Sequence, residues 1–198
     1  MSTDAINQSG VAGILASAGG ALSFVRCLNS GDVTAVSGGG SSLYVGGISG
    51  YTNAAVTMSD CGNTGHLRGS GVAAAGLAAM CHANTSTLTN SYNQGNLTYN
   101  SSTSTGGGIT SAVNSRPTLK NCYFSGTVSI VGKLTNYGNM SGSYNHSNYT
   151  AHCTDCYSID QTAKGTNYAA ANHTITRNTD NEYVTSSRTR LRDALNNW

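Results

Sequence analysis

Residues 61–67 of the chain are CGNTGHL, and this arrangement recurs along the sequence. Related heptads occupy residues 27–33 (CLNSGDV), 91–97 (SYNQGNL) and 122–128 (CYFSGTV). Serine replaces cysteine in the third copy, and phenylalanine replaces asparagine in the fourth. The closing glycines are Gly31, Gly65, Gly95 and Gly126, at spacings of 34, 30 and 31 residues. A period of this size is typical of a repeat architecture in which each unit stacks on the next.

Each unit also begins alike, with a glycine followed by an aliphatic residue some 13 residues before the cysteine position. These aliphatic residues are Ile14, Ile48, Leu77 and Ile109, and a degenerate fifth copy leads from Met140 to Cys156 without a closing glycine. Apolar residues between the two motifs alternate, as in Leu22 and Phe24, which indicates strands rather than helices.

Three short strands separated by glycine-rich bends fit a unit of this length. The sequence therefore predicts an all-β protein, a right-handed parallel β-helix of about five coils, with equivalent residues about 4.8 Å apart along the axis. We expect the β-helix over residues 1–160 and a capping segment over 161–198.

Equivalent positions define three apolar columns that we expect to enclose the core. The first is Ile14, Ile48, Leu77, Ile109 and Met140; the second is Phe24, Met58, Leu88 and Leu119; the third is Val33, Leu67, Leu97 and Val128.

Asn29, Asn63 and Asn93 precede the closing glycines by two residues. We expect them at a corner, where asparagine tolerates left-handed backbone and its amides form a ladder along the axis. The residue before the cysteine position is polar in every copy and is predicted to point outward. These residues are Arg26, Asp60, Asn90, Asn121 and Asp155.

The turns at residues 47–50 (GISG) and 108–111 (GITS), followed by a Cys/Ser-Tyr segment and Gly-x-Val, resemble the GLUG repeats of bacterial surface proteins. The resemblance covers roughly residues 11–160. It implies display on the cell surface or secretion as part of a larger protein, in an adhesin-like context.

The last part of the chain differs in character, because seven of the eighteen charged residues lie in its final 22 positions. Ser186 or Ser187 is suited to cap a short helix that includes Leu191 and Leu195, with Trp198 as an apolar plug. A solenoid needs its end strands covered, so we interpret this segment as the C-terminal cap.

The composition narrows the range of partners. Lys+Arg 10 against Asp+Glu 8 gives a formal charge of +2, which provides no electrostatic reason to expect nucleic acid. The chain contains no run of 18 apolar residues, so no membrane-spanning helix is expected.

Six cysteines raise the question of disulfides or metal. We expect Cys27, Cys61 and Cys122 to be mostly free buried thiols, because Ser91 is tolerated in the same column. Cys153-x-x-Cys156 with His152 lacks the second ligand pair of a structural zinc site, since Cys81 and His82 belong to a distant coil. The sequence predicts neither a metal nor a cofactor.

The carboxylates give little support to catalysis. Asp60 and Asp155 share a column three coils apart, about 14 Å, which is too far for a glycosidase pair. Asp32 and His66 lie in neighbouring coils and are expected to touch, either as a surface ion pair or as a carboxylate-assisted base.

Tyr92, Tyr123 and Tyr157 follow the cysteine position in successive coils. Two arrangements are open: an outward stripe that stacks on sugar rings or packs on a neighbouring protein, and a column that packs under a loop. These features favour a non-catalytic module, an adhesin stalk or adhesive repeat domain, with glycans or surface proteins as partners. Two alternatives remain open: a carbohydrate-active β-helix enzyme, and a subunit of a fibre that self-associates through the solenoid ends.

Overall fold

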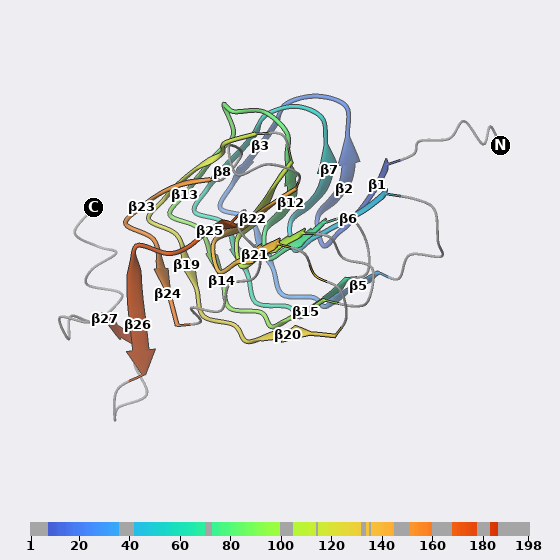
Figure 1. Cartoon of the computed structure of the whole chain (residues 1–198). Helices are drawn as coiled ribbons and strands as arrows, with labels where there is room; N and C mark the ends of the chain where they lie inside the picture. Colours follow the sequence, from blue (N-terminus) through green and yellow to red (C-terminus); the bar gives the residue numbers. More distant parts are fainter. Residues whose placement is uncertain are drawn as a thin grey trace.

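A computed structural model describes residues 8–35, 42–69, 73–99, 105–113, 115–131, 134, 136–144, 151–159, 168–177 and 183–185. Short strands wind into successive coils and stack into parallel sheets (Figure 1). The predicted all-β parallel solenoid is thereby confirmed. Within the described ranges there is no helix long and apolar enough to cross a membrane.

Four coils contain five strands each. The first has β1 (Gln8–Ala12), β2 (Leu15–Ala18), β3 (Leu22–Val25), β4 (Leu28–Asn29) and β5 (Val33–Ala35). The second has β6 (Ser42–Gly46), β7 (Ser49–Thr52), β8 (Val56–Ser59), β9 (Gly62–Asn63) and β10 (Leu67–Gly69). The third has β11 (Ala73–Ala75), β12 (Ala78–Cys81), β13 (Thr87–Thr89), β14 (Tyr92–Asn93) and β15 (Leu97–Tyr99). The fourth has β16 (Thr105–Gly107), β17 (Thr110–Val113), β18 (Thr118–Lys120), β19 (Tyr123–Phe124) and β20 (Val128–Ile130).

A fifth coil continues four of the five sheets with β21 (Asn136–Gly138), β22 (Ser141–Tyr144), β23 (His152–Thr154) and β24 (Tyr157–Ser158). The expectation of three strands per coil is wrong. The bend at Gly13–Ile14 separates β1 from β2, and the left-handed residue Arg26 separates β3 from β4, so the chain turns more often than the apolar alternation indicates.

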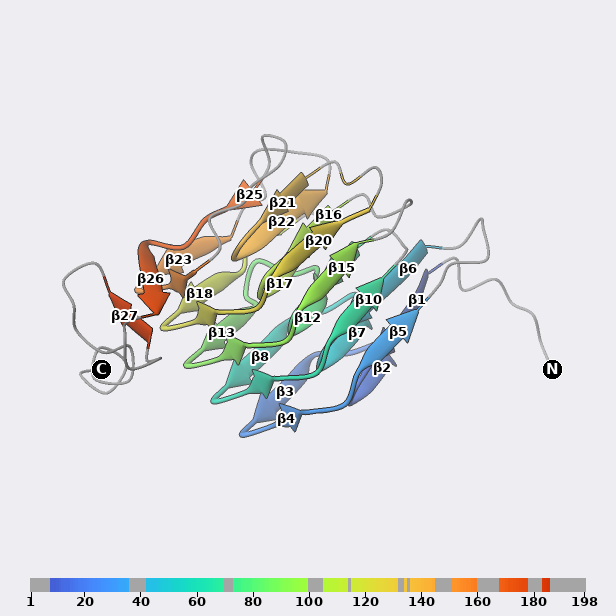
Figure 2. The same ribbon diagram turned by 90° about the horizontal axis from the view of Figure 1, so that it is seen from below.

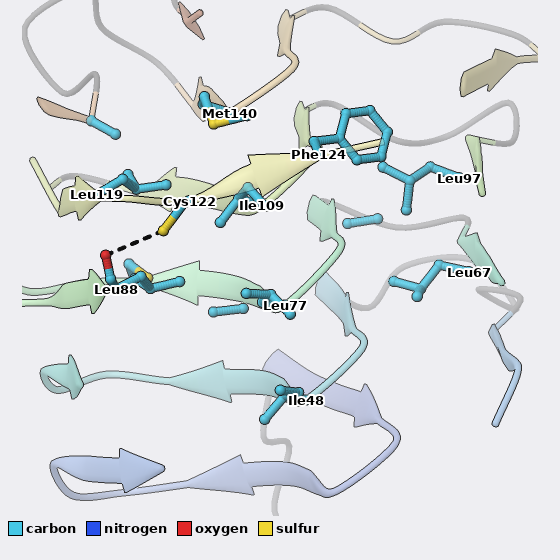
Figure 3. Packing of buried hydrophobic residues seen from close by; sticks show 14 of the residues in the cluster. Ile48, Leu67, Leu77, Leu88, Leu97, Ile109, Leu119, Cys122, Phe124 and Met140 are labelled. Carbon is cyan, nitrogen blue, oxygen red and sulfur yellow. Dashed lines mark hydrogen bonds between the residues drawn. The ribbon is translucent and has the colours of Figure 1, made fainter. Parts of the chain in front are cut away.

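The strand registers align the predicted apolar columns. Leu88 pairs with Met58 on one side and Leu119 on the other, and Leu67 pairs with Val33 and Leu97. Figure 3 shows Ile48, Leu77, Ile109 and Met140 in the core, and all four are fully buried. The fully buried side chains of the inner coils thus form one continuous apolar interior.

Ile14 departs from this pattern. It was expected in the same inward column, but its side chain is 45% exposed. It lies in the first coil, where no preceding coil of the described residues covers it. The column position is right, and Ile14 is exposed because, among the described residues, a coil packs on only one side of it.

The closing glycines form the predicted column for a steric reason. A Cβ on Gly65 would lie 2.0 Å from the carbonyl oxygen of Gly31, and one on Gly95 would lie 1.9 Å from that of Gly65. A Cβ on Gly126 would likewise lie 2.1 Å from the carbonyl oxygen of Gly95. Successive coils therefore approach too closely at this corner for any side chain.

The predicted asparagine ladder is also present. The Nδ2 of Asn29 donates to the Oδ1 of Asn63 over 2.7 Å, and the Nδ2 of Asn63 donates to the Oδ1 of Asn93 over 2.8 Å. Phe124 takes the place of asparagine in the fourth coil, so Asn93 donates instead to the carbonyl oxygen of Gly108.

The ladder asparagines were expected to have left-handed backbone, and this expectation is wrong. The left-handed conformation occurs instead at the residue before each cysteine position. Positive φ values near 50° occur there in all five coils, at Arg26, Asp60, Asn90, Asn121 and Asp155. The asparagines of the ladder lie in extended strands, since their side chains must point inward to meet. Asn121 is buried rather than outward-facing.

The end of the described chain departs from the coil pattern. β25 (Tyr168–Ala169) runs antiparallel to β22. β26 (His173–Arg177) continues the sheet of β24 in parallel and pairs with the antiparallel β27 (Tyr183–Thr185). Figure 2 shows these strands at the end of the solenoid opposite β1–β5. The helix expected around Leu191 lies outside the described residues.

Candidate functional site: a tyrosine strip on one face

Three tyrosines are in register on the outer side of the sheet that contains β4, β9, β14, β19 and β24. Tyr92 in β14 pairs with Tyr123 in β19, and Tyr123 pairs with Tyr157 in β24. The rings of Tyr92 and Tyr123 have centroids 5.1 Å apart and planes inclined by only 8°. The two rings stack on each other, and both side chains are half-buried, so part of this stacked pair is accessible on this face.

The second coil provides room for the strip through a glycine. A Cβ on Gly62 would lie 2.3 Å from the Cζ of Tyr92, so the ring rests directly over this residue. Leu28, next in the same column, is exposed and extends the apolar surface. The sequence analysis did not single out Gly62 as part of the strip. The signal that could have found it is its alignment with Tyr92, since both residues directly precede a ladder asparagine.

Tyr157 is not available in the same way as the other two tyrosines. It is 7% exposed, it stacks on His173 with ring centroids 4.8 Å apart, and it packs with the buried Ile175 of β26. Burial, with the nearby Asp155 carboxylate, raises the pKa of the Tyr157 hydroxyl. The accessible strip therefore consists of Tyr92 and Tyr123.

Amide side chains border the strip on both sides. The Nε2 of Gln94 donates to the hydroxyl of Tyr123 over 2.8 Å. At the left-handed corner before the strip, Asn90 donates to the Oδ1 of Asp60, and Asn121 donates to the Oδ1 of Asn90. Hydrogen-bonding groups thus lie beside the stacked tyrosine pair.

Asp32 and His66 touch, but neither expected arrangement is present. The Oδ1 of Asp32 accepts a hydrogen bond from the backbone N–H of His66 over 2.8 Å, and the Nδ1 of His66 accepts one from the backbone N–H of Asn96 over 3.3 Å. Asn96 in turn accepts from the backbone N–H of Thr127. Each side chain after a closing glycine satisfies the backbone of the next coil, so among these described residues no side-chain ion pair or acid–base pair forms.

All six cysteines are free thiols, and four of them, Cys27, Cys61, Cys122 and Cys156, occupy one column of the coils, with Cys27 only half-buried. Cys61 and Cys122 are fully buried. Each thiol contacts the backbone carbonyl oxygen of the residue two positions earlier in its own coil and a backbone carbonyl oxygen of the preceding coil. Figure 3 shows the contact of Cys122 with the carbonyl of Leu88. Ser91 occupies the same place with a hydroxyl that donates to the carbonyl of Thr89.

Three thiols approach one another near the last coil. Cys153, in register with Leu119, points into the core beside Cys122 and Cys156. Hydrogen bonds from Cys122 and Cys153 lower the pKa of the Cys156 thiol, and burial raises the pKa of Cys122. Cys81 lies in β12, whose sheet contains neither β23 nor β24.

The other polar positions do not converge. Asp60 and Asp155 stand in one column, separated by Asn90 and Asn121. The Oδ1 of Asp155 lies 3.8 Å from the Nε2 of His173, and both side chains are solvent-accessible. Among the described residues, no three His, Cys, Asp or Glu side chains are arranged to hold a metal ion.

Comparison with known protein families, with characterised proteins and with solved structures finds no match to this chain. The fold class is therefore defined by the structure, and the resemblance to GLUG repeats rests on the repeat residues alone.

Proposed function

We propose that this protein is a non-catalytic binding and structural module, and that it presents the Tyr92–Tyr123 strip to a glycan. The observation that carries the proposal is the parallel stacking of these two half-buried rings beside amide groups. The C–H groups of a sugar ring pack on the accessible parts of aromatic side chains, and its hydroxyl groups bond to amides of the kind found at Asn90 and Gln94.

The use of the polar side chains supports a non-catalytic role. Asp32 and His66, the closest candidates for an acid–base pair, are both engaged with backbone N–H groups. Side chains with catalytic chemistry thus stabilise the stacking of coils instead of facing a common substrate position.

Placement on a cell surface or in a secreted assembly follows from the resemblance to GLUG repeats and belongs to the same proposal. In this setting the coils act as a stalk or adhesive segment, and a neighbouring surface protein is the second partner that fits an aromatic strip. The carbohydrate-active enzyme remains the alternative.

A glycan array followed by titration calorimetry with the best glycan tests the proposal. We expect Tyr92→Ala and Tyr123→Ala each to weaken binding about fivefold to tenfold, since a stacked aromatic contributes on the order of 1 kcal/mol. Tyr168→Ala is the matched control, because Tyr168 is an exposed tyrosine of β25 away from the strip.

Two outcomes would contradict the proposal. Equal affinity of the strip variants and the wild-type protein would remove the strip from the binding surface. Release of oligosaccharides from a polysaccharide panel, abolished in Asp32→Asn or His66→Ala, would establish the enzyme instead.

A further inference from the structure

The fifth coil differs from the other described coils at the left-handed corner. In every coil two side chains, three residues apart, point inward on either side of this corner. The second of them is the cysteine position, which Cys156 occupies in the fifth coil. The first is Cys153 in the fifth coil, and the equivalent residues of the other coils are large and apolar: Phe24, Met58, Leu88 and Leu119. Among the described coils, two thiols therefore flank this corner in the fifth alone.

One side-chain amide holds this corner closed. The Oδ1 of Asn172 accepts a hydrogen bond from the backbone N–H of Cys156 over 3.0 Å, and its Nδ2 donates to the carbonyl oxygen of Cys153 over 3.2 Å. The thiols of Cys153 and Cys156 are also hydrogen-bonded to each other. A disulfide requires two cysteines whose backbones are close and whose side chains point together, and the corner provides both.

The two thiols differ in accessibility. Cys153 is half-buried, whereas Cys156 and the neighbouring Cys122 are buried. A small molecule that approaches the corner therefore meets the sulfur of Cys153 first. The thiol of Cys156 makes only long contacts with carbonyl oxygens, at 3.5 Å to Thr154 and 3.6 Å to Leu119. Loss of its proton thus sacrifices little hydrogen bonding.

We propose that Cys153 and Cys156 are a reversible dithiol–disulfide site whose oxidant is a small-molecule disulfide. The Cys153 thiolate attacks one sulfur of that disulfide, and the first small thiolate leaves. The Cys156 thiolate then attacks the Sγ of Cys153 and releases the second. The two cysteines lose two protons and two electrons, and the small disulfide is reduced to two thiols.

The surroundings of the two sulfurs set the pace of these steps. Hydrogen bonds from Cys122 and Cys153 lower the pKa of the Cys156 thiol, which favours the thiolate needed for the second step. The hydrogen bond to Cys156 raises the pKa of Cys153, so few molecules carry the thiolate of the first step. The first step is therefore slow, it accelerates as pH rises, and the site stays reduced until an oxidant is supplied.

The site lies where β26 joins the fifth coil. The backbone N–H of His173, the first residue of β26, donates to the carbonyl oxygen of Cys156 over 2.9 Å. Asn172, which holds the corner, directly precedes this strand. Figure 2 shows β23 and β26 together at this end of the solenoid. The disulfide therefore fixes the corner on which β26 docks.

Equilibration of the full chain in a series of glutathione redox buffers tests the proposal. Each sample is quenched with acid, alkylated after unfolding and digested with trypsin. Peptide 134–164 contains Cys153 and Cys156 and no other cysteine, and peptide 121–133 contains Cys122. As the share of glutathione disulfide rises, we expect peptide 134–164 to appear unalkylated and lighter by two hydrogen atoms. Peptide 121–133 should stay alkylated.

Three serine variants separate the two steps. Cys156→Ser should leave glutathione attached to Cys153, because the thiol that displaces it is gone. Cys153→Ser should carry neither a disulfide nor glutathione in peptide 134–164, since Cys156 is buried. Cys122→Ser is the matched control, and its peptide 134–164 should still form the disulfide.

Asn172 is a positioning residue, and its variants test the closed corner. Asn172→Ala should shift the equilibrium with glutathione toward the dithiol about fivefold, the effect of roughly one lost hydrogen bond. Asn172→Asp keeps an acceptor for the Cys156 N–H but no donor for Cys153, so its shift should be smaller. Asn53→Ala, at an exposed asparagine, should leave the equilibrium unchanged. Far-ultraviolet circular dichroism verifies the fold of each variant.

Several results would overturn the proposal. One is full alkylation of peptide 134–164 at every buffer ratio. Another is a cross-link between peptides 121–133 and 134–164, which would make Cys122 the partner. Glutathione that stays attached to Cys153 in the wild-type protein would show that Cys156 does not complete the second step. An equilibrium unchanged in Asn172→Ala would remove the closed corner on which the proposal rests.

Discussion

Asn29 and Asn63, 34 residues apart in sequence, join their side-chain amides over 2.7 Å inside the solenoid. Each amide also bonds to the glycine corner of its own coil: Asn29 through the carbonyl of Gly31, and Asn63 through that of Gly65. The ladder thus couples the shape of each corner to the spacing between coils.

Replacement of the central asparagine should be costly. Asn63→Ala removes the bonds to Asn29, Asn93 and Gly65 and leaves buried polar groups without partners. We expect the free energy of unfolding to fall by about 3 kcal/mol, measured by urea denaturation. Asn53→Ala, at an exposed asparagine, should change it by less than about 0.5 kcal/mol. Similar losses for both variants would contradict a structural role for the ladder.

Two glycines in the same column should respond differently to alanine. In Gly65→Ala the new Cβ would collide with the carbonyl oxygen of Gly31, and overpacking of this kind costs about 1–3 kcal/mol. In Gly31→Ala the nearest atom would be 3.7 Å from the new Cβ, so the protein should lose less than about 1 kcal/mol of stability. Equal destabilisation would mean that close approach of the coils is not what selects glycine.

The cysteine column should accept serine. In Cys122→Ser the hydroxyl can donate to the carbonyl of Lys120, as the hydroxyl of Ser91 does to that of Thr89. We expect a loss of about 1–2 kcal/mol, smaller than for the larger and differently shaped Cys122→Leu. Alkylation of the unfolded chain without reductant should label all six thiols, and stoichiometric disulfides would contradict this prediction.

Stability should fall in alkaline solution through Cys81. Burial raises the pKa of this thiol from 9.0 to about 11, against a smaller opposing effect of its hydrogen bond to Thr110. Between these pH values the folded chain holds a proton that the unfolded chain releases, so the free energy of unfolding decreases as pH rises. The contribution of Cys81 is complete below pH 9 and is lost through pH 11, a change of about 2–3 kcal/mol.

Urea denaturation of the wild-type protein and Cys81→Ala across this pH range measures the effect of that thiol. The difference in unfolding free energy between the two proteins should shrink as pH rises. A difference that stays constant would show that Cys81 does not titrate with unfolding.

The sequence by itself determined the architecture, because periodicity is a property of the chain. Regular spacing of Gly31, Gly65, Gly95 and Gly126 requires equivalent positions to stack, and the apolar columns and the asparagine ladder follow from that stacking. The sequence did not predict the number of strands in each coil, because a bend as short as the one at Arg26 does not change the alternation of apolar residues.

Only the tertiary structure decided how deeply each column position is buried, because burial depends on neighbours some 30 residues away and on which coils pack on either side. Ile14 and Ile48 have the same place in the repeat, but only Ile48 is covered on both sides. Tyr123 and Tyr157 likewise share a column, and β26 covers Tyr157 while Tyr123 keeps accessible surface. The chain repeats a local pattern, whereas burial, and with it the availability of a residue for binding, is set by the coils and strands that pack on either side.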